Sequence, residues 1–237
     1  MIKFLKNFLW KIFNKEKYSD LKRNESINQK IDNYNSNVLN KIELFRTKLE
    51  SEKILNFVHS GHLGDLIYSL PIIQEISKKS QCNFYVNVNK KMDKPYGNKP
   101  SGNVLLNKKT ANMLLPLLRK QNYINEAEIY SNQKIDIDLD FFRETQISVN
   151  FHSIRWYSHL VGVPIDMNKK YLEVEESKLF KNKIVIVRSQ RYRNIFINYK
   201  FLESLKDVVC IGLKDEFDDL KRDIKNLEFY DCKDFLE

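Results

Sequence analysis

The sequence predicts an α/β protein built on mostly parallel sheets, with a helical extension at its amino terminus. Three observations lead to this fold class. Short apolar strands alternate with helical segments from residue 54 onwards, and this order is typical of parallel strands joined by crossover helices. Residues 54–76 form a strand, a glycine-containing turn and a helix in succession. Residues 184–187 are an uninterrupted β-branched run, as expected of a buried parallel strand.

Composition narrows the class of protein further. The 237 residues are 42% hydrophobic and 30% charged, which suits one large domain or two small ones. The formal net charge of +9 favours an anionic partner such as nucleic acid, a phosphorylated metabolite or lipid headgroups. The three cysteines show no CxxC spacing, so we expect three core residues rather than disulfides or zinc ligands. We find no membrane-spanning apolar run and no signal peptide, and therefore expect a cytoplasmic protein.

We expect residues 1–50 to form a basic helical extension outside the α/β fold. Residues 1–23 contain seven basic and two acidic residues. On a helical wheel the early lysines and asparagines share one face, and the opposite face carries Ile2, Leu5, Phe8, Leu9, Ile12 and Phe13. This pattern is typical of a helix in an anionic membrane interface. A helix packed on the protein's own core or on a second subunit shows the same pattern, so a membrane contact through residues 1–17 is one of two interpretations.

The turn that follows the strand at 54–59 has groups suited to ligand binding. Only six glycines occur in the chain, so two of them within four residues indicate a backbone that approaches a ligand closely. The amino terminus of the next helix offers free N–H groups and a positive dipole end. An aspartate there would stay ionised and could accept a proton from a bound hydroxyl. Alternatively, the aspartate only caps the helix. The turn residues concerned are Gly61, His62, Gly64 and Asp65.

The string from Gly61 to Pro71 resembles the opening of the heptosyltransferase-like glycosyltransferases of family 9, which have the GT-B fold. In that family a Gly-Asp pair is followed by an apolar helix start and by a proline six residues after the aspartate, and Asp65 and Pro71 match this spacing. The resemblance implies that Asp65 is the general base that deprotonates the acceptor hydroxyl, and that Gly61 and Gly64 shape the loop. The string is neither a P-loop nor a dinucleotide fingerprint, which disfavours an NTPase or a NAD enzyme.

The middle of the chain continues the alternation of strands and helices. We expect a helix at 104–122 interrupted near Pro116, a strand and then a helix at 147–161, and further strands at 82–88, 127–130 and 135–139. The basic, turn-rich residues 89–103 form a loop that either meets a phosphate-bearing acceptor or is simply solvated.

A basic and aromatic cluster follows in the predicted helix. His152, Arg155 and His159 share one helical face. The neighbouring residues include no carboxylate or cysteine that would complete a metal site, so we expect no metal. We interpret His152 and Arg155 as acceptor-side contacts, with plain surface placement as the alternative.

The domain organisation that we expect is an acceptor domain at 51–175 and a partial second Rossmann-like domain at 176–237. Helices are expected at 201–206 and 214–225, and strands at 208–212 and 227–230. The chain stops where a further helix would begin, so we expect a second domain that is truncated or reduced.

Several arginines follow the strand at 184–187. Guanidinium groups bind a diphosphate bidentately. In the resembled family the loop at this position helps to hold the nucleotide-sugar donor. The resemblance thus assigns the donor site to Arg188, Ser189, Arg191, Arg193 and Gly212. A positively charged surface turn is the alternative.

These observations leave three hypotheses about function. The first, implied by the resemblance, is an inverting transferase that moves a sugar from a nucleotide-sugar donor to a cell-envelope glycan or glycolipid, as in lipopolysaccharide synthesis. It would use Asp65 as the base, need no cofactor and work at the inner face of the membrane. The second is a truncated, non-catalytic binding protein of the same fold. The third is a nucleic-acid-binding protein, which we rank last because no groove-reading element accompanies the basic residues.

Overall fold

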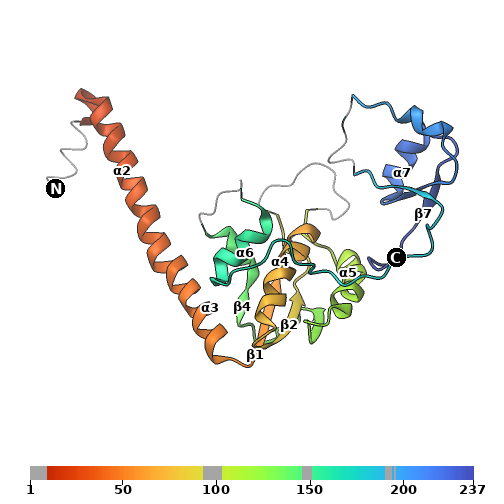
Figure 1. Cartoon of the computed structure of the whole chain (residues 1–237). Coiled ribbons are helices and arrows are strands. Elements are labelled where there is room, and N and C mark those ends of the chain that lie inside the picture. The colour runs from red at the N-terminus through yellow and green to blue at the C-terminus, as the bar shows by residue number, and fades with distance from the viewer. Residues whose placement is uncertain (1–9, 93–102, 146–150, 190–193, 195) are drawn as a thin grey trace.

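A computed structural model describes residues 10–92, 103–145, 151–189, 194 and 196–237, and the structural statements below concern these residues. They form a long helical arm, an α/β unit around one hydrophobic core and a smaller α/β unit around a second core (Figure 1). Most of the predicted amphipathic segment, residues 1–9, lies outside the described part of the chain.

The arm is helical from Lys15 to Ser51. It consists of α2 (Lys15–Asn33), a π-helical segment η1 (Tyr34–Leu39) and α3 (Asn40–Ser51). None of the residues of α2 is buried, whereas the first core includes Val38, Ile42 and Phe45. These three side chains recur at intervals of four and three residues, so they lie on one face of the helix and pack together on the α/β unit. The last part of the predicted extension, from Val38 onwards, therefore packs on the α/β unit and contributes these side chains to its core.

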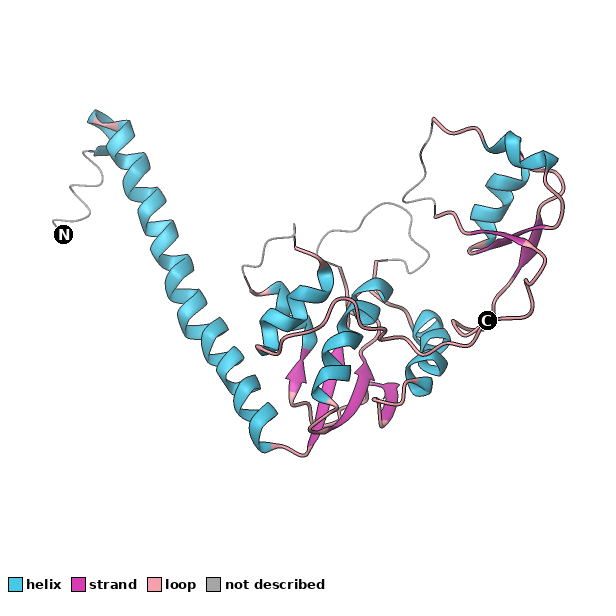
Figure 2. Ribbon diagram, viewed as in Figure 1, coloured by secondary structure: helices cyan, strands magenta, loops and turns pink. Residues whose placement is uncertain are grey.

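The first unit contains a four-stranded parallel sheet (Figure 2). Its strands are β1 (Ile54–His59), β2 (Gln81–Val86), β3 (Glu126–Ile129) and β4 (Ile137–Asp138), in the spatial order β3-β2-β1-β4. The connecting helices are α4 (Leu63–Ile76), α5 (Lys108–Lys120), the 3₁₀ segment η2 (Leu139–Arg143) and α6 (Ser153–Val161). Five of the six residues of β2 are buried, as expected of a strand that is covered on both faces. The predicted parallel α/β architecture is confirmed.

The strand order reverses between β1 and β4. The chain places β2 and β3 on one side of β1 and then returns to pair β4 with the other side. In open parallel sheets such a reversal opens a space at the carboxyl ends of the two strands, and ligands commonly bind there.

The helix α5 differs from its prediction. It begins at Lys108, after Asn107, whose side-chain oxygen accepts a hydrogen bond of 2.8 Å from the backbone N–H of Thr110. It then continues through Pro116 to Lys120, so the predicted interruption is wrong. Burial of the neighbouring leucines holds this helix against the sheet and outweighs the one hydrogen bond that a proline removes. The strand predicted to start at 147 falls partly outside the described residues.

The second unit contains a three-stranded parallel sheet. Its elements are β5 (Ile184–Ile186), the 3₁₀ segment η4 (Tyr199–Ser204), β6 (Val208–Ile211), α7 (Lys214–Lys221) and β7 (Glu228–Tyr230), and its strand order is β5-β6-β7. The expectation that 184–187 is buried is wrong: Val185, on the edge strand β5, is 40% exposed, and Val187, directly after that strand, is 73% exposed. The helix predicted at 201–206 is the 3₁₀ segment η4, and α7 is shorter than predicted.

The cysteines are unpaired, as predicted, but only two of them are core residues. Cys82 and Cys210 are buried, whereas Cys232 is half-buried. Burial raises the pKa of the Cys82 thiol to about 12. Among the described helices, none combines the length and the apolar character that crossing a bilayer would require.

Candidate functional site at the ends of β1 and β4

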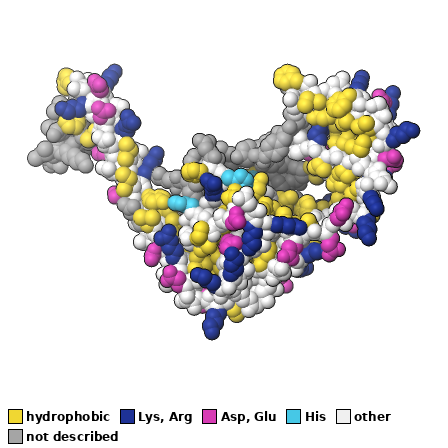
Figure 3. Space-filling model, in the orientation of Figure 1, with side chains coloured by type: hydrophobic (Ala, Val, Ile, Leu, Met, Phe, Trp, Pro, Cys, Tyr) yellow, Lys and Arg dark blue, Asp and Glu magenta, His cyan; other side chains and the backbone are white. Residues whose placement is uncertain are grey.

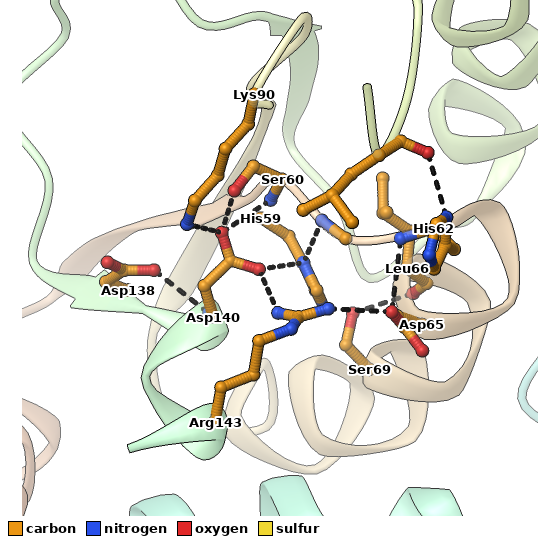
Figure 4. Close-up of polar contacts among 12 residues, drawn as sticks. His59, Ser60, His62, Asp65, Leu66, Ser69, Lys90, Asp138, Asp140 and Arg143 are labelled. Carbon is orange, nitrogen blue, oxygen red and sulfur yellow. Dashed lines mark hydrogen bonds and ion pairs between the residues drawn. The ribbon is translucent and has the colours of Figure 1, made fainter. Parts of the chain in front are cut away.

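Polar side chains converge where the strand order reverses. His59 and Ser60 come from the end of β1, and Asp138 and Asp140 from β4 and the start of η2 (Figure 4). Other members lie on neighbouring elements: Asp65 in α4, Lys90 after β2 and Arg143 at the end of η2. Because the carboxyl ends of adjacent parallel strands share one edge of the sheet, residues far apart in sequence meet here. We call this group the Asp140 cluster.

The buried carboxylate of Asp140 is the centre of the cluster. Its Oδ2 accepts hydrogen bonds from the backbone N–H of Ser60 at 3.0 Å, from the Ser60 hydroxyl and from Lys90 Nζ at 3.3 Å. Its Oδ1 lies 2.6 Å from Arg143 Nη1 and 3.0 Å from His59 Nδ1. Burial alone would raise the pKa of Asp140, but the hydrogen bond and charge of His59 and the charges of Arg143 and Lys90 lower it well below its usual range. Asp140 is therefore ionised at neutral pH.

Asp138 has the opposite electrostatic environment although it lies only two residues earlier. Its Oδ1 accepts a hydrogen bond of 2.9 Å from the backbone N–H of Asp140, which caps η2. Burial and the neighbouring negative charge of Asp140 raise the pKa of Asp138. Two nearby carboxylates whose pKa values move apart are a common property of functional sites.

Asp65 caps α4 and keeps its carboxylate partly exposed. It is the third residue of α4, and its Oδ2 accepts from the His62 backbone N–H at 3.1 Å, which caps the helix. The same oxygen lies 2.8 Å from Arg143 Nη2. The side chain is 21% exposed, and its Oδ1 has no hydrogen-bond partner among the described residues (Figure 4). Asp65 is thus held in place by one oxygen, and the other can meet a ligand.

Arg143 links the carboxylates of Asp140 and Asp65. One guanidinium nitrogen contacts Asp140 and another contacts Asp65. The guanidinium also lies 4.4 Å from the centroid of the Phe142 ring, and Phe142 stacks on Trp156 with centroids 5.2 Å apart. The indole N–H of Trp156 is buried and has no hydrogen-bond partner in the described part of the chain. These contacts fix Arg143, and with it the position of Asp65.

A buried chain of hydrogen bonds, which we call the buried relay, links β1 to α6 and supports the turn between β1 and α4. His59 Nε2 lies 2.7 Å from the Tyr157 hydroxyl, which donates to the backbone carbonyl of Asp65 at 2.9 Å. Because the phenol has one proton and gives it to that carbonyl, His59 must donate its Nε2–H to the phenol oxygen. Its Nδ1 lies 2.9 Å from the backbone N–H of Gly61. Burial raises the pKa of Tyr157, so the phenol keeps its proton.

The two glycines of the turn differ in their steric environment. A Cβ atom on Gly61 would lie 2.6 Å from His59 Cε1 and 2.8 Å from Asp65 Cβ, so no larger residue fits without a shift of the turn. A Cβ on Gly64 would meet only the Tyr68 ring, at 3.9 Å. The structure therefore gives Gly61 a steric role in the turn and gives Gly64 none.

The predicted acceptor-side residues lie next to α4. His62 Nδ1 is 3.0 Å from the Leu105 carbonyl oxygen, which ties the turn to the chain before α5. His152 caps α6 and is exposed, and its ring lies 5.8 Å from that of Tyr68 on α4. Arg155 is exposed one turn later on α6. In the described ranges no group of three or more His, Cys, Asp or Glu side chains is arranged to hold a metal ion.

The structure separates the residues predicted for the donor site. Arg188 is buried, forms an ion pair with Asp219 and lies 5.1 Å from the Tyr199 ring centroid. It is therefore engaged inside the second unit, contrary to the expectation of an arginine that faces a diphosphate. Ser189 is exposed, and Arg191 and Arg193 lie outside the described residues. Gly212, after β6, has a φ of +151°, and a Cβ there would lie 3.0 Å from Glu216 Oε2.

Both units share this local arrangement of glycine and carboxylate. Glu216 is the third residue of α7 and accepts from the Leu213 backbone N–H at 3.2 Å, as Asp65 does from His62 in α4. In each unit a glycine after the strand leaves room for the carboxylate of the next helix.

Sequence reasoning missed most of the Asp140 cluster. Its members His59, Asp140 and Arg143, and the neighbouring Tyr157, lie outside the motifs that predict a site, and Lys90 lies in the predicted basic loop at 89–103. One available signal was the pair of aspartates at the end of a predicted strand, because such residues reach the edge of a parallel sheet where ligands bind.

No known protein family, curated protein or solved structure matches the chain. Its class therefore follows from the fold and the site alone. The chain is an α/β protein with parallel, Rossmann-like sheets, and its polar cluster lies at the point where the strand order of the larger sheet reverses.

Proposed function

We propose that the chain is a glycosyltransferase of the GT-B type that transfers a sugar from a nucleotide-sugar donor to a glycan or glycolipid acceptor with inversion. The observation that carries the proposal is the hydrogen bonding of the two carboxylate oxygens of Asp65. One oxygen is fixed by the His62 N–H and by Arg143, and the other has no partner among the described residues. A general base needs such a positioned and partly exposed carboxylate.

In the proposed reaction Asp65 removes the proton of the acceptor hydroxyl while the oxygen of that hydroxyl attacks the anomeric carbon of the donor. The bond from that carbon to the diphosphate oxygen breaks, and the nucleoside diphosphate leaves with the electron pair. Cationic groups near the diphosphate would stabilise the leaving group. Two units with parallel sheets support the GT-B assignment, since that fold pairs an acceptor domain with a donor domain.

A non-catalytic binding protein of the same fold is the second candidate. It is favoured by the ion pair of Arg188 with Asp219, which engages one of the arginines expected at the donor diphosphate. It is also favoured by the helix-capping hydrogen bond of Asp65, because a purely structural aspartate would make the same bond.

Two measurements on the full chain separate these candidates. Calorimetric titration with a panel of nucleoside diphosphates and nucleotide sugars should give saturable binding to one nucleotide. Release of that nucleoside diphosphate from its sugar is then compared between the wild type and Asp65→Asn. We expect release to fall about 10²- to 10⁴-fold with unchanged nucleotide affinity. The amide keeps an oxygen for the His62 N–H, so the cap survives.

The outcomes have distinct meanings. Unchanged nucleotide release in Asp65→Asn would eliminate the general-base assignment. Binding without any turnover in the wild type would favour the non-catalytic candidate. If no nucleotide bound at all, the transferase proposal would fail for this chain.

A further inference from the structure

The helical arm ends in exposed hydrophobic side chains and in lysines. Residues 10–13 are helical, and Ile12 and Phe13 are 52% and 79% exposed. Lys17 Nζ lies 5.2 Å from the Trp10 ring. Figure 3 shows this end of the arm standing clear of the α/β part of the molecule. Packing on the protein's own core, one of the interpretations open from the sequence, does not apply to these residues.

The composition of the arm changes sharply along its length. Residues 1–17 include nine hydrophobic residues, five lysines and one glutamate, which gives a net charge of 5 − 1 = +4. In contrast, α2 has nine charged residues among its 19, and its hydrophobic residues are Tyr18, Leu21, Ile27 and Ile31. The end of the arm therefore suits an apolar surface with negative charge, whereas α2 suits water.

We propose that the amino-terminal end of the arm docks on an anionic lipid surface and that α2 is the spacer between that surface and the α/β unit. The helical residues 10–13 and the first lysines of α2, Lys15 and Lys17, provide the contact. An indole beside aliphatic and phenyl side chains suits the headgroup region of a bilayer, and neighbouring lysines are attracted to anionic lipids.

A second copy of the chain fits the arm less well than a lipid surface. A helix-helix seam requires hydrophobic residues at a sustained spacing of three and four residues. Asn14, with φ −148° and ψ 82°, separates the helical residues 10–13 from α2. The hydrophobic residues 10–13 therefore do not continue in register along α2. Lipid docking needs no such continuity, because only the end of the helix has to enter the interface.

The geometry of the arm gives the docked molecule an orientation. Two residues separate the end of α3 from the start of β1, and the chain reverses direction there (Figure 1). The arm thus runs antiparallel to β1, and its amino-terminal end points to the side where β1 ends at the Asp140 cluster. The 19 residues of α2 span about 28 Å at 1.5 Å per residue. Docking would turn the candidate site towards the lipid surface and hold it at a distance.

Co-sedimentation of the full chain with vesicles tests the proposal. We expect binding to vesicles of phosphatidylglycerol and phosphatidylcholine, and little binding to phosphatidylcholine alone. The double variant Ile12→Glu with Phe13→Glu should abolish binding. Lys11→Gln, Lys15→Gln and Lys17→Gln should each weaken it about fivefold, the effect of one basic residue near an anionic surface. All of these side chains lie at the exposed end of the arm, and circular dichroism would confirm that the variants fold.

The matched control is Ile27→Glu with Ile31→Glu, which changes the two exposed isoleucines of α2 and should leave vesicle binding unchanged. The chain has two tryptophans, so quenching by brominated lipids that is lost in Trp10→Phe would place Trp10 in the interface. Equal binding to both vesicle types, or binding that survives Ile12→Glu with Phe13→Glu, would overturn the proposal. So would a dimer in solution that the α2 variant dissociates and that vesicles do not disrupt. The docking proposal does not depend on the proposed transferase activity, and Asp65→Asn should bind vesicles like the wild type.

Discussion

Asp140→Asn should strongly destabilise the first α/β unit at neutral pH although it barely changes the shape of the side chain. Ser60, Lys90 and Arg143 all donate hydrogen bonds to the carboxylate, from both of its oxygens' sides. Whichever way an amide is turned, its NH₂ group faces one of these donors. The substitution also removes the negative charge that compensates the cations of Lys90 and Arg143.

The expected magnitude follows from the burial of Asp140, whose side chain is 8% exposed. Removing one partner from a buried, hydrogen-bonded ion pair costs about 3–5 kcal/mol. In a domain of this size each kcal/mol lowers Tm by about 2–4 °C. We therefore expect the Tm of Asp140→Asn to fall by about 10 °C at pH 7.

The loss should depend on pH in a defined direction. The pKa of Asp140 is lower in the folded chain than in the unfolded chain, so its ionised form stabilises the fold at neutral pH. That contribution declines as the pH falls below about 4, where the unfolded carboxyl binds protons first, and it disappears below the folded pKa. The gap between wild type and variant should therefore narrow towards acid pH.

Asp138→Asn is the matched control, with the opposite expected sign. The pKa of Asp138 is raised by burial and by Asp140, so its ionisation costs stability as the pH rises through that pKa. The amide keeps the oxygen that caps η2 and cannot ionise, so it should raise the stability at neutral pH.

Urea unfolding measures both variants, with Trp156 fluorescence in a Trp10→Phe background reporting on the first unit. A midpoint for Asp140→Asn within experimental error of wild type at pH 7 would refute the reasoning. A difference that stayed constant between pH 7 and pH 3 would refute the electrostatic part of it.

Three further predictions concern the surroundings of the cluster. Tyr157→Phe removes the hydroxyl between His59 Nε2 and the Asp65 carbonyl and should lower the free energy of unfolding by about 2–4 kcal/mol. The control, Tyr68→Phe on the exposed side of α4, should change that free energy by less than about 0.5 kcal/mol. Equal effects of the two substitutions would rule out the buried relay. Gly61→Ala should destabilise the fold by about 1–3 kcal/mol through the 2.6 Å contact that its Cβ would make. In contrast, Gly64→Ala should be neutral or stabilise α4 by up to about 1 kcal/mol. Thermal unfolding of the two variants measures this difference. The Cys82 thiol, with its pKa raised to about 12 by burial, should resist a thiol reagent at pH 8 in the folded chain and react once the chain is unfolded in urea; rapid labelling of the folded chain at that residue would contradict its burial.

Local patterns in the sequence predicted most of the secondary structure. The strands predicted at 54–59 and 208–212 correspond to β1 and β6, and the helix predicted after Gly61 is α4. These elements could be predicted because side-chain periodicity and turn residues act over a few neighbours. The same spacing rules identified Asp65 as a residue at the amino terminus of a helix, where its carboxylate does cap α4.

The composition of residues 184–187 predicted a strand correctly but its burial wrongly. A β-branched run favours extended backbone wherever it lies. Whether both faces of the strand are covered depends on what packs on the sheet, and in the fold Val185 of β5 stays 40% exposed.

The Asp140 cluster shows most clearly what local sequence patterns cannot predict. His59 and Tyr157 are 98 residues apart in the chain, and Arg143 contacts Asp65 across 78 residues. Periodicity reports which face of an element is apolar but not which elements become neighbours. Long-range pairing places β4 beside β1 and brings their carboxyl ends together. The sequence therefore contains the types of residue that suit a ligand. Their proximity at one edge of the sheet depends on the crossovers between strands, which only the folded chain makes.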